Sequence, residues 1–211
     1  MNKKSVLITG ASGLLGQALV KESLNFDFSV YAHYNSNPQP DTHHCRWLQG
    51  DFSTITGIQQ FCIKYQRELK RCTHLINNYG PINLKVTKKL ESSDYISEFH
   101  QNVIPAVEIT RFCLGHPTLK SVIFLGFEFL GKDKSYKKIL PYAIAKNSLL
   151  QICMSYAECY KNICFNIVSP VTLAGAAVPL RNGLQVTPSH VARQIIEIMT
   201  NGATGGHFVI Q

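Results

Sequence analysis

The sequence predicts an α/β fold in which helices cover both faces of one doubly wound parallel sheet. Two observations lead to this prediction. Apolar runs of strand length alternate with helical patterns, and a glycine-rich turn joins the first strand to the first helix. Strand–helix alternation requires crossover connections, which build parallel sheets with helices on both sides. The 211 residues are 45% hydrophobic, enough for a sizeable core, and no linker or repeat divides them. We therefore expect one domain over residues 1–211.

Strand-like and helix-like segments follow each other from end to end. The predicted strands are residues 6–8, 30–32, 46–48, 75–76, 122–125, 164–168 and 208–210, and the predicted helices are residues 14–25, 54–69, 92–113, 142–160 and 188–199. Ser53 is expected to cap the second helix, and Thr187 the last one, ahead of a first-turn proline. Pro105 cannot donate a hydrogen bond to Gln101, so the third helix should kink or loosen there.

The turn after the first strand, within KSVLITGASGLLG at residues 4–16, indicates a phosphate-binding site. Gly10 permits a sharp turn, Gly13 lets a pyrophosphate approach the backbone, and Gly16 lets the helix pack close to the strand. Backbone N–H groups and the helix N-terminus favour an anion at this point. The alternative is a turn that is merely rich in glycine. The expected contacts of a dinucleotide here are Gly10, Ser12, Gly13, Leu14, Leu15 and Gly16.

The residues after the second strand bear on the choice of dinucleotide. An NAD site usually has a carboxylate there to hold the ribose hydroxyls, but none precedes Asp41 in this chain. We expect Tyr34, Asn35 and Ser36 to contact the cofactor, with the last two receiving a 2′-phosphate and His33 close by. This pattern favours NADP(H) over NAD(H). Alternatively, these residues only form a polar loop.

Two further turns complete the expected cofactor site. Asp51 follows the third strand, where its carboxylate can accept the adenine amino group while Phe52 offers its backbone. Alternatively, Asp51 only caps the next helix. A second turn, with Asn78, Tyr79 and Gly80, follows the fourth strand, and its small and amide residues suit a surface over which a cofactor lies.

A second chemical centre is expected where Tyr142 and Lys146 begin a helix. A spacing of four residues places the phenol and the ammonium on one helix face. A tyrosine pKa of about 10 is too high for acid–base work near neutrality, and a nearby cation lowers it. An isolated Tyr-x-x-x-Lys pair is most often a chance surface pair, but here it follows a fifth strand in a chain that opens with a phosphate-binding turn. Asn102 lies at the helix defect made by Pro105, where a freed carbonyl can bind a water.

Together these motifs resemble the short-chain dehydrogenases/reductases over nearly the whole chain. The motifs that carry the resemblance are TGASGLLG (9–16), HYNSN (33–37), GDFS (50–53), NNYG (77–80), Asn102, YAIAK (142–146) and NIVSP (166–170). The glycine spacing resembles that of the extended or atypical members. HYNSN, GDFST and YAIAK are also similar to the pteridine and dihydromonapterin reductases.

The resemblance implies a Rossmann-type sheet of seven strands in the order 3-2-1-4-5-6-7, and it implies roles for individual residues. Tyr142 would exchange a proton with the substrate, Lys146 would lower the pKa of Tyr142 and hold the nicotinamide ribose, and the Asn102 carbonyl would anchor a water. The nicotinamide carboxamide would lie against Pro170, Val171 and Thr172. A homodimer or homotetramer built on the helices of Asn102 and Tyr142 is also implied.

The chain departs from the family pattern after the fifth strand, where a serine should polarise the substrate oxygen. Residues 126–129 read Gly-Phe-Glu-Phe, without a hydroxyl. Glu128 is a candidate substitute, or else an ordinary surface carboxylate. The segment 171–187, which carries a substrate-covering lid in the family, is short. The leading hypothesis is an NADPH-dependent reductase of a carbonyl or C=N bond in a small, pteridine-like substrate. The alternative is a cofactor-binding protein without redox turnover that acts as a sensor or assembly partner.

Composition and charge limit the remaining possibilities. The net charge is +8, but the basic residues are spread out and match no nucleic-acid-binding module, so no nucleic-acid partner is expected. No apolar run approaches the roughly 20 residues needed to cross a membrane. Seven scattered cysteines and the absence of a leader pattern favour reduced thiols and a cytoplasmic protein. His43 and His44 have no second ligand pair at zinc spacing, and we expect no metal.

Overall fold

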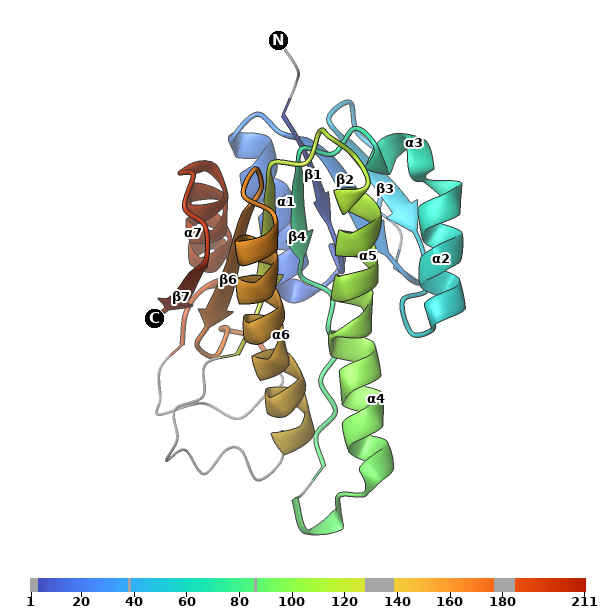
Figure 1. Ribbon diagram of the computed structural model, residues 1–211, viewed down its shortest axis with the longest axis vertical. Helices are drawn as coiled ribbons and strands as arrows, with labels where there is room; N and C mark the ends of the chain where they lie inside the picture. The colour runs from blue at the N-terminus through green and yellow to red at the C-terminus, as the bar shows by residue number, and fades with distance from the viewer. Residues whose placement is uncertain (1–3, 38, 86, 128–138, 177–184) are drawn as a thin grey trace.

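Seven parallel strands form one sheet in the order β3-β2-β1-β4-β5-β6-β7 (Figure 1). The computed structural model describes residues 4–37, 39–85, 87–127, 139–176 and 185–211. The strands are β1 (Ser5–Ile8), β2 (Ser29–Tyr34), β3 (Cys45–Gln49), β4 (His74–Asn77), β5 (Ser121–Leu125), β6 (Cys164–Pro170) and β7 (Gly206–Ile210). Every strand pairing is parallel, so the carboxyl ends of all seven strands lie on one edge. The predicted fold class and strand order are confirmed.

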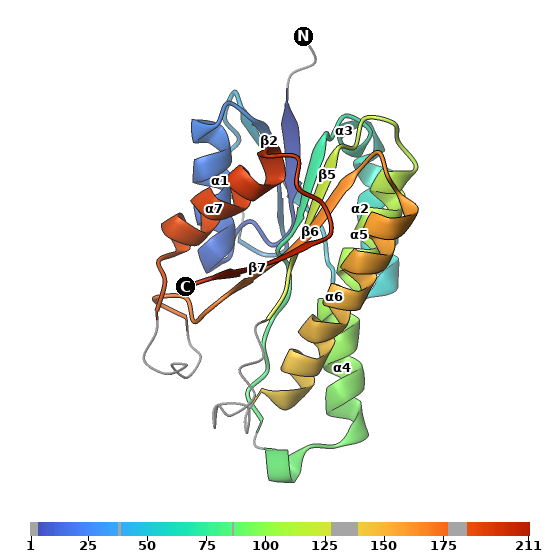
Figure 2. The same cartoon turned by 60° about the vertical axis from the view of Figure 1, so that its left-hand side comes forward.

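Helices cover both faces of the sheet. They are α1 (Leu14–Asn25), α2 (Ile55–Lys64), α3 (Gln66–Leu69), α4 (Ser92–Asn102), α5 (Ile104–Leu114), α6 (Leu140–Cys159) and α7 (Pro188–Thr200), with a 3₁₀ turn, η1 (Thr87–Lys89), before α4. Figure 2 shows α1 and α7 together on one face, with α2, α5 and α6 on the other. The strands are therefore shielded from water on both sides, as parallel sheets require.

The hydrophobic core is divided by the sheet into two clusters. In β1, Val6 and Ile8 belong to the cluster beneath α1 and α7, while Leu7 belongs to the cluster on the opposite face. All three side chains are completely buried. Because successive side chains of a strand point to opposite faces, a strand buried on both sides reads as a continuous apolar run. This is the pattern from which the strands were predicted.

Two predicted helices are interrupted in the structure. The segment 92–113 divides into α4 and α5 at Val103, two residues before Pro105, which lies in the first turn of α5. This break was expected because proline lacks the N–H that would continue the helix. The segment 54–69 also divides, at Tyr65 between α2 and α3, which the sequence analysis did not anticipate.

The predicted helix caps are correct at one position and wrong at the other. Thr187 caps α7 and accepts a hydrogen bond from His190 N, as expected. Ser53 does not cap α2, because Thr54 accepts the bond from Gly57 N at 3.0 Å. Ser53 instead donates its own N–H to Asp51 Oδ1 at 2.8 Å. Asp51 therefore shapes the turn that precedes α2 and is not its cap.

Helix α4 and the first half of α6 extend past the carboxyl edge of the sheet (Figures 1 and 2). The two helices pack against each other along this extension. The start of α6, which carries Tyr142 and Lys146, therefore stands beside the strand ends where ligands of such sheets bind. The fold places the second predicted centre at the same edge as the glycine turn.

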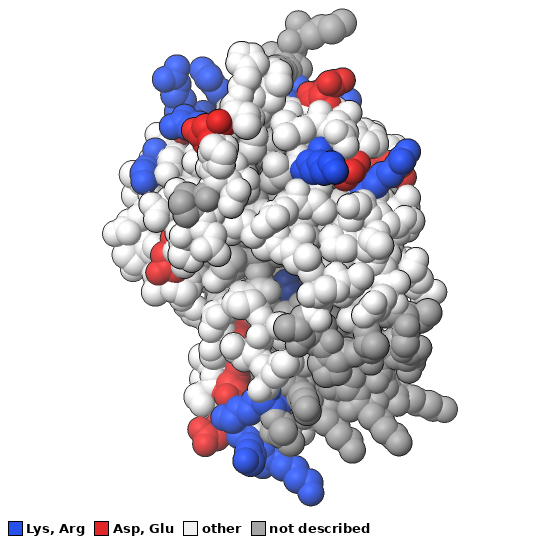
Figure 3. Space-filling model, turned by 180° about the vertical axis from the view of Figure 1, so that it is seen from behind, with Lys and Arg blue, Asp and Glu red and all other residues white. Residues whose placement is uncertain are grey.

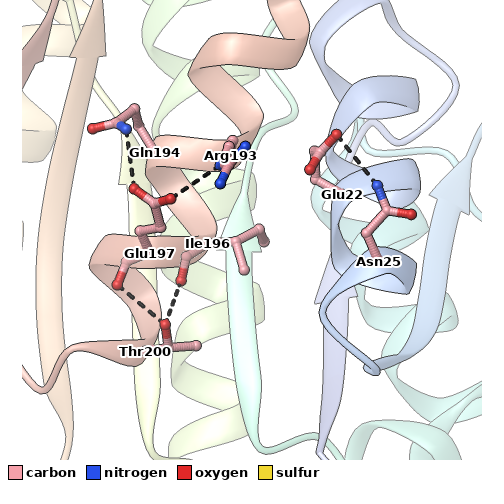
Figure 4. A network of polar contacts seen from close by, with 7 residues as sticks. All are labelled: Glu22, Asn25, Arg193, Gln194, Ile196, Glu197 and Thr200. Atoms are coloured by element: carbon pink, nitrogen blue, oxygen red, sulfur yellow. Dashed lines mark hydrogen bonds and ion pairs between the residues drawn. The ribbon is translucent and has the colours of Figure 1, made fainter.

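Helix α7 supports the opposite face and has no part in this edge. Its buried side includes Val191, Ile195 and Met199. On its polar side Glu197 accepts hydrogen bonds from Arg193 at 3.2 Å and Gln194 at 3.0 Å, next to the Glu22–Asn25 pair of α1 (Figure 4). These surface pairs contribute little stability individually, so the apolar side of α7 accounts for its attachment.

The surface carries its charges in scattered groups. On the face shown in Figure 3, Lys and Arg gather towards the two ends of the molecule, with a largely uncharged region between them. No helix in the described part of the chain combines the length and apolarity of a membrane span. All seven cysteines are free thiols, and five of them are buried.

Candidate active site

The turn after β1 has the geometry that a phosphate cradle requires. Gly10 has a φ of 63°, a left-handed conformation that favours glycine. A Cβ on Gly16 would lie 2.2 Å from Gly10 O, so only glycine lets α1 pack this closely against the turn. Gly13 is the N-cap residue of α1 and offers no capping side chain. The first N–H groups of a helix have no intrahelical acceptor, so this helix end is suited to an anion.

The two residues that follow β4 hold this turn in place. Asn78 donates from Nδ2 to the carbonyl oxygens of Thr9 and Gly10, each at 3.0 Å. Tyr79 N donates to Thr9 Oγ1 at 2.9 Å. The predicted Asn78–Tyr79 turn therefore lies directly against the glycine turn and connects β4 to it.

His33 is the second support of the turn, and sequence reasoning assigned it a different place. Its Nδ1 accepts a hydrogen bond from Gly10 N at 3.0 Å, and its Nε2 lies 3.0 Å from Gly50 O, to which it donates in this tautomer. The ring stacks on Phe52 with the ring centroids 3.6 Å apart. Burial lowers the pKa of His33 to about 4, so the ring is neutral near pH 7. With both nitrogens bonded inside the protein, His33 fixes the backbone and is not placed to bind a phosphate.

A cleft of about 390 Å³ joins the two predicted centres. Among the predicted site residues, those that line it are Gly10, Ser12, Gly13, Leu14, Leu15, Gly16, Tyr34, Asn35, Asn78, Tyr79, Gly80, Tyr142, Lys146 and Pro170. The cleft thus runs from the glycine turn, past the ends of β4 and β5, to the start of α6. Its lining also includes His33, discussed above, and Pro81, Leu125, Gly126 and Leu173, which were not predicted as site residues. Leu125 and Gly126 could have been predicted from the sequence, because they lie at the end of a predicted strand, where the ligands of such sheets bind.

The remaining predicted residues lie outside this cleft. Asp51 lines a neighbouring cavity of about 290 Å³ with Lys64, and Asn35 borders both this cavity and the cleft. Phe52 is fully buried beneath His33, and Ser36 is exposed. Hydrogen bonds from Ser53 lower the pKa of Asp51, which keeps its carboxylate charged.

A second, smaller cavity of about 190 Å³ adjoins the cleft at Tyr142. Val171 and Thr172 line it, and so do the apolar side chains of Ile82, Phe127, Ile139, Leu173 and Ala176. The two cavities share Gly126, Tyr142, Pro170 and Leu173. The phenol of Tyr142 thus belongs to both the long cleft and the small apolar cavity.

The end of β5 has no hydroxyl at the position expected for one. Gly126 N continues the sheet by donating to Val168 O at 2.8 Å, and Phe127 follows. The Phe127 ring meets the Tyr142 ring edge-on, with centroids 5.7 Å apart. The predicted substitute, Glu128, lies outside the described residues. The apolar ring of Phe127 therefore lies beside the Tyr142 phenol, where the family pattern has a group that polarises the substrate oxygen.

Lys146 lines the cleft next to Gly80, and Asn102 lies beside it, outside the lining of the cleft. The Lys146 side chain is only 2% exposed, and its Nζ lies 5.8 Å from the centroid of the Tyr142 ring. Burial lowers the pKa of Lys146 to about 8, while the negative charge of Glu98 acts in the opposite direction. A Cβ on Gly80 would lie 2.4 Å from Asn102 Oδ1 and 2.5 Å from Lys146 Nζ, so any side chain here would displace these two groups. The structure thus brings Asn102, Lys146 and Tyr142 together, as predicted.

A parallel sheet with a glycine turn at one end of a cleft and a Tyr-Lys pair at the other defines a dinucleotide-binding α/β protein. The sequence matches the NAD dependent epimerase/dehydratase family over residues 6–209, and the chain belongs to this family. The extended-type glycine spacing seen in the sequence agrees with this assignment.

Solved structures with the same fold are short-chain reductases and related proteins. The angucycline C-6 ketoreductase LanV with bound NADP has 17% identity and a TM-score of 0.82, with 98% of this chain and 93% of that chain covered. A blue fluorescent protein from a metagenomic library, in complex with NADPH, has 17% identity and a TM-score of 0.86, with 100% and 97% covered. A short chain dehydrogenase from Leptospira borgpetersenii with bound NAD+ has 18% identity and a TM-score of 0.85, with 100% and 92% covered. At these identities the likeness concerns the fold.

Proposed function

We propose that this protein is an NADP(H)-dependent oxidoreductase that reduces a carbonyl or C=N bond of a small substrate. The observation that carries the proposal is the position of Tyr142, whose side chain lines both the long cleft and the small apolar cavity. A cofactor in the cleft and a substrate in the cavity would meet at this phenol. The retention of Lys146 one helical turn away supports an acid–base role for Tyr142.

The residues present fit a dinucleotide. The glycine turn and the N-terminus of α1 suit a pyrophosphate, and the cleft continues from there to Lys146. A bound nicotinamide would supply the hydride. Tyr142 would then protonate the substrate atom that gains negative charge, and Lys146 would favour the phenolate that remains. Pro170 borders both cavities and would limit where the substrate and the nicotinamide can lie.

The preference for NADP(H) over NAD(H) is supported by the polar side chains at the end of β2. Asn35 and Ser36 occupy the region in which an NAD site usually has a carboxylate. A carboxylate there would repel a 2′-phosphate, and these two side chains do not. Asn35 also borders the neighbouring cavity, where the opposite charges of Lys64 and Asp51 offset each other, so the support comes from the uncharged side chains of Asn35 and Ser36. These observations favour a phosphorylated ribose.

We further propose that the substrate is pteridine-like. This proposal rests on the resemblance of HYNSN, GDFST and YAIAK to the pteridine reductases and on the size of the cavity of about 190 Å³. The aromatic ring of Phe127 in its wall suits a flat heteroaromatic ring. Besides Tyr142, Thr172 is a lining residue of this cavity with a hydroxyl group.

The Tyr142→Phe variant tests the enzymatic role. Removing the hydroxyl should lower turnover roughly 10²–10⁴-fold, the usual contribution of a positioned acid, while NADPH binding is retained. The measurement is substrate-dependent loss of NADPH absorbance over panels of pteridines, quinones and keto esters. Tyr160→Phe, at the far, exposed end of α6, is the matched control and should keep its activity. Equal turnover in wild type and Tyr142→Phe would contradict the acid–base role.

A second candidate function is cofactor binding without redox turnover, as a sensor or assembly partner. It is favoured by the contact of Phe127 with Tyr142, because this position offers no group to polarise a substrate oxygen. Tight NADPH binding with no turnover across the same substrate panels would support this function over the first.

A further inference from the structure

Glu98 is a buried acid next to the proposed active site that neither the sequence analysis nor the family motif includes. It lies on α4 one turn before Asn102, and only 2% of its surface is exposed. Its Oε1 accepts a hydrogen bond from Asn83 N at 3.0 Å, and its Oε2 accepts one from Asn102 Nδ2 at 2.8 Å. Because both oxygens face N–H donors, the site suits a charged carboxylate and not an amide.

These bonds determine which way the Asn102 amide faces. Its Nδ2 lies among three acceptors: Glu98 Oε2, Glu98 O at 3.1 Å and Pro81 O at 3.0 Å. The amide oxygen must then point to the other side, towards the small space beside Gly80 that it shares with Lys146 Nζ. Asn102 Oδ1 is buried and meets no hydrogen-bond donor among the described residues. A buried, unpartnered oxygen beside a buried ammonium is a favourable electrostatic arrangement.

Lys146 needs this environment because burial opposes its charge. The groups that face it are Glu98 and Asn102 from α4, the Tyr142 ring from its own helix, and the backbone at Gly80. Of these, Glu98 is the group that bears a negative charge near neutral pH. The pKa of Glu98 is raised above its ordinary value because burial outweighs the hydrogen bonds of Asn83 and Asn102 and the charge of Lys146, which lower it. Each charge of the Glu98–Lys146 pair thus favours the other.

We propose that Glu98 is a positioning residue for Lys146: its carboxylate holds the Asn102 amide oxygen towards the ammonium and supplies the charge that keeps this buried amine protonated. The role of Lys146 in turnover rests on the proposed function. The electrostatic pairing itself does not, because it belongs to the protein without any ligand.

The test is the titration of Lys146 in the ligand-free protein, followed by NMR of ¹³Cε-labelled lysine, with Lys146→Met used to assign the signal. In Glu98→Gln the titration midpoint should fall by on the order of one pH unit or more, because the opposing charge is lost. Glu98→Asp, which keeps the charge, should recover at least part of this shift. Glu197→Gln on α7 is a matched control far from the site and should leave the midpoint unchanged.

An unchanged Lys146 midpoint in Glu98→Gln would overturn the proposal and leave Glu98 as a clamp of the loop at Asn83. Should Glu98→Gln fail to fold, Asn102→Ser tests the part of the proposal that concerns the amide oxygen, since it removes this oxygen and keeps the charge of Glu98. A lowered midpoint in this variant supports the proposal, and an unchanged one contradicts it.

Turnover gives a separate readout. With an active wild type, the alkaline limb of kcat/KM should move to lower pH in Glu98→Gln by the same amount as the Lys146 titration. A wild type that binds NADPH without turnover would defeat the proposed enzymatic function and leave the NMR result to decide the role of Glu98.

Discussion

Gly13 and Gly16 belong to the same turn but meet different surroundings. A Cβ on Gly16 would lie 2.2 Å from Gly10 O and 2.6 Å from Ala11 Cα, and this backbone has no room to move. A Cβ on Gly13 would lie 3.3 Å from Gly10 O and would otherwise point to open space. The first glycine therefore serves the ligand side and the second serves the packing of α1.

This difference leads to a paired prediction. Gly16→Ala should destabilise the protein by about 1–3 kcal/mol, as overpacked sites do, measured by urea unfolding. Gly13→Ala should change the unfolding free energy by less than this and should weaken NADPH binding at least about tenfold, because its methyl group would occupy the pyrophosphate approach. Equal effects of the two variants on stability would contradict this division of roles.

Asn35 provides the residue-level test of cofactor choice. In Asn35→Asp the new carboxylate should weaken NADPH binding by roughly tenfold or more and leave NADH binding similar or tighter, because only NADPH carries the 2′-phosphate. Fluorescence titration with both cofactors measures this. Asn201→Asp, at the C-terminus of α7, is the matched control for an added charge. Tighter binding of NADH than of NADPH by the wild type would contradict the proposed preference.

At the scale of elements, α4 presents an apolar side that no other part of the described chain covers. Ile96 is 68% exposed and Phe99 41%, and they border a shallow groove with Tyr95 and Ile104. Ile144, on the adjoining α6, is 50% exposed. Apolar surface gathered on two adjacent helices is typical of subunit contacts. We propose a homodimer or homotetramer that uses this surface.

The corresponding prediction concerns Ile96→Glu. A charge at the centre of this surface should convert the oligomer to monomers, as measured by sedimentation velocity, with the helical CD signal unchanged. Ile63→Glu is the matched control, since Ile63 is 75% exposed on α2, away from α4 and α6. A wild-type protein that sediments as a monomer would contradict the proposed assembly.

At the scale of the whole molecule, two buried histidines link folding to pH. Burial lowers the pKa of both His33 and His74 from 6.5 to about 4. Between these values the unfolded chain binds protons on both rings while the folded chain does not, so stability must fall as the pH decreases. Since one pKa unit corresponds to about 1.4 kcal/mol, the loss by pH 4 is on the order of 2–3 kcal/mol for each ring. Above pH 6.5 this contribution is constant.

Urea unfolding at pH 7, 5.5 and 4.5 measures this dependence. The free energy of unfolding should decrease over this range, and the decrease should be smaller in His74→Gln, which removes one titrating ring. Dinucleotide affinity should fall only near pH 4, where His33 of the folded protein becomes protonated, because a protonated Nδ1 cannot accept the bond from Gly10 N. Equal stability at pH 7 and 4.5 would contradict the neutral, buried state of these rings.

Sequence reasoning succeeded where the signal is local. The Gly10–Gly16 turn and the Tyr142–Lys146 spacing are each contained within one short segment, so their geometry follows from the backbone of a turn or a helix. The alternation of apolar runs predicted the parallel sheet, because strand–helix alternation requires crossover connections. The strand order came from the resemblance to the short-chain dehydrogenases/reductases. The end of α4 was also predictable, since Pro105 interrupts any helix.

Only the tertiary structure decided what lies around these motifs. His33 forms hydrogen bonds with Gly10 and Gly50, which lie in the turns after β1 and β3. Glu98 contacts Asn83 and acts on the charge of Lys146, and both of these residues lie on other segments of the chain. Nothing in the neighbouring sequence of either residue indicates such partners. Burial also decided the charge states, because a histidine and a lysine have ordinary pKa values until the fold removes water from them. The sequence by itself thus specified the two ends of the cleft, and packing decided which buried charges support them.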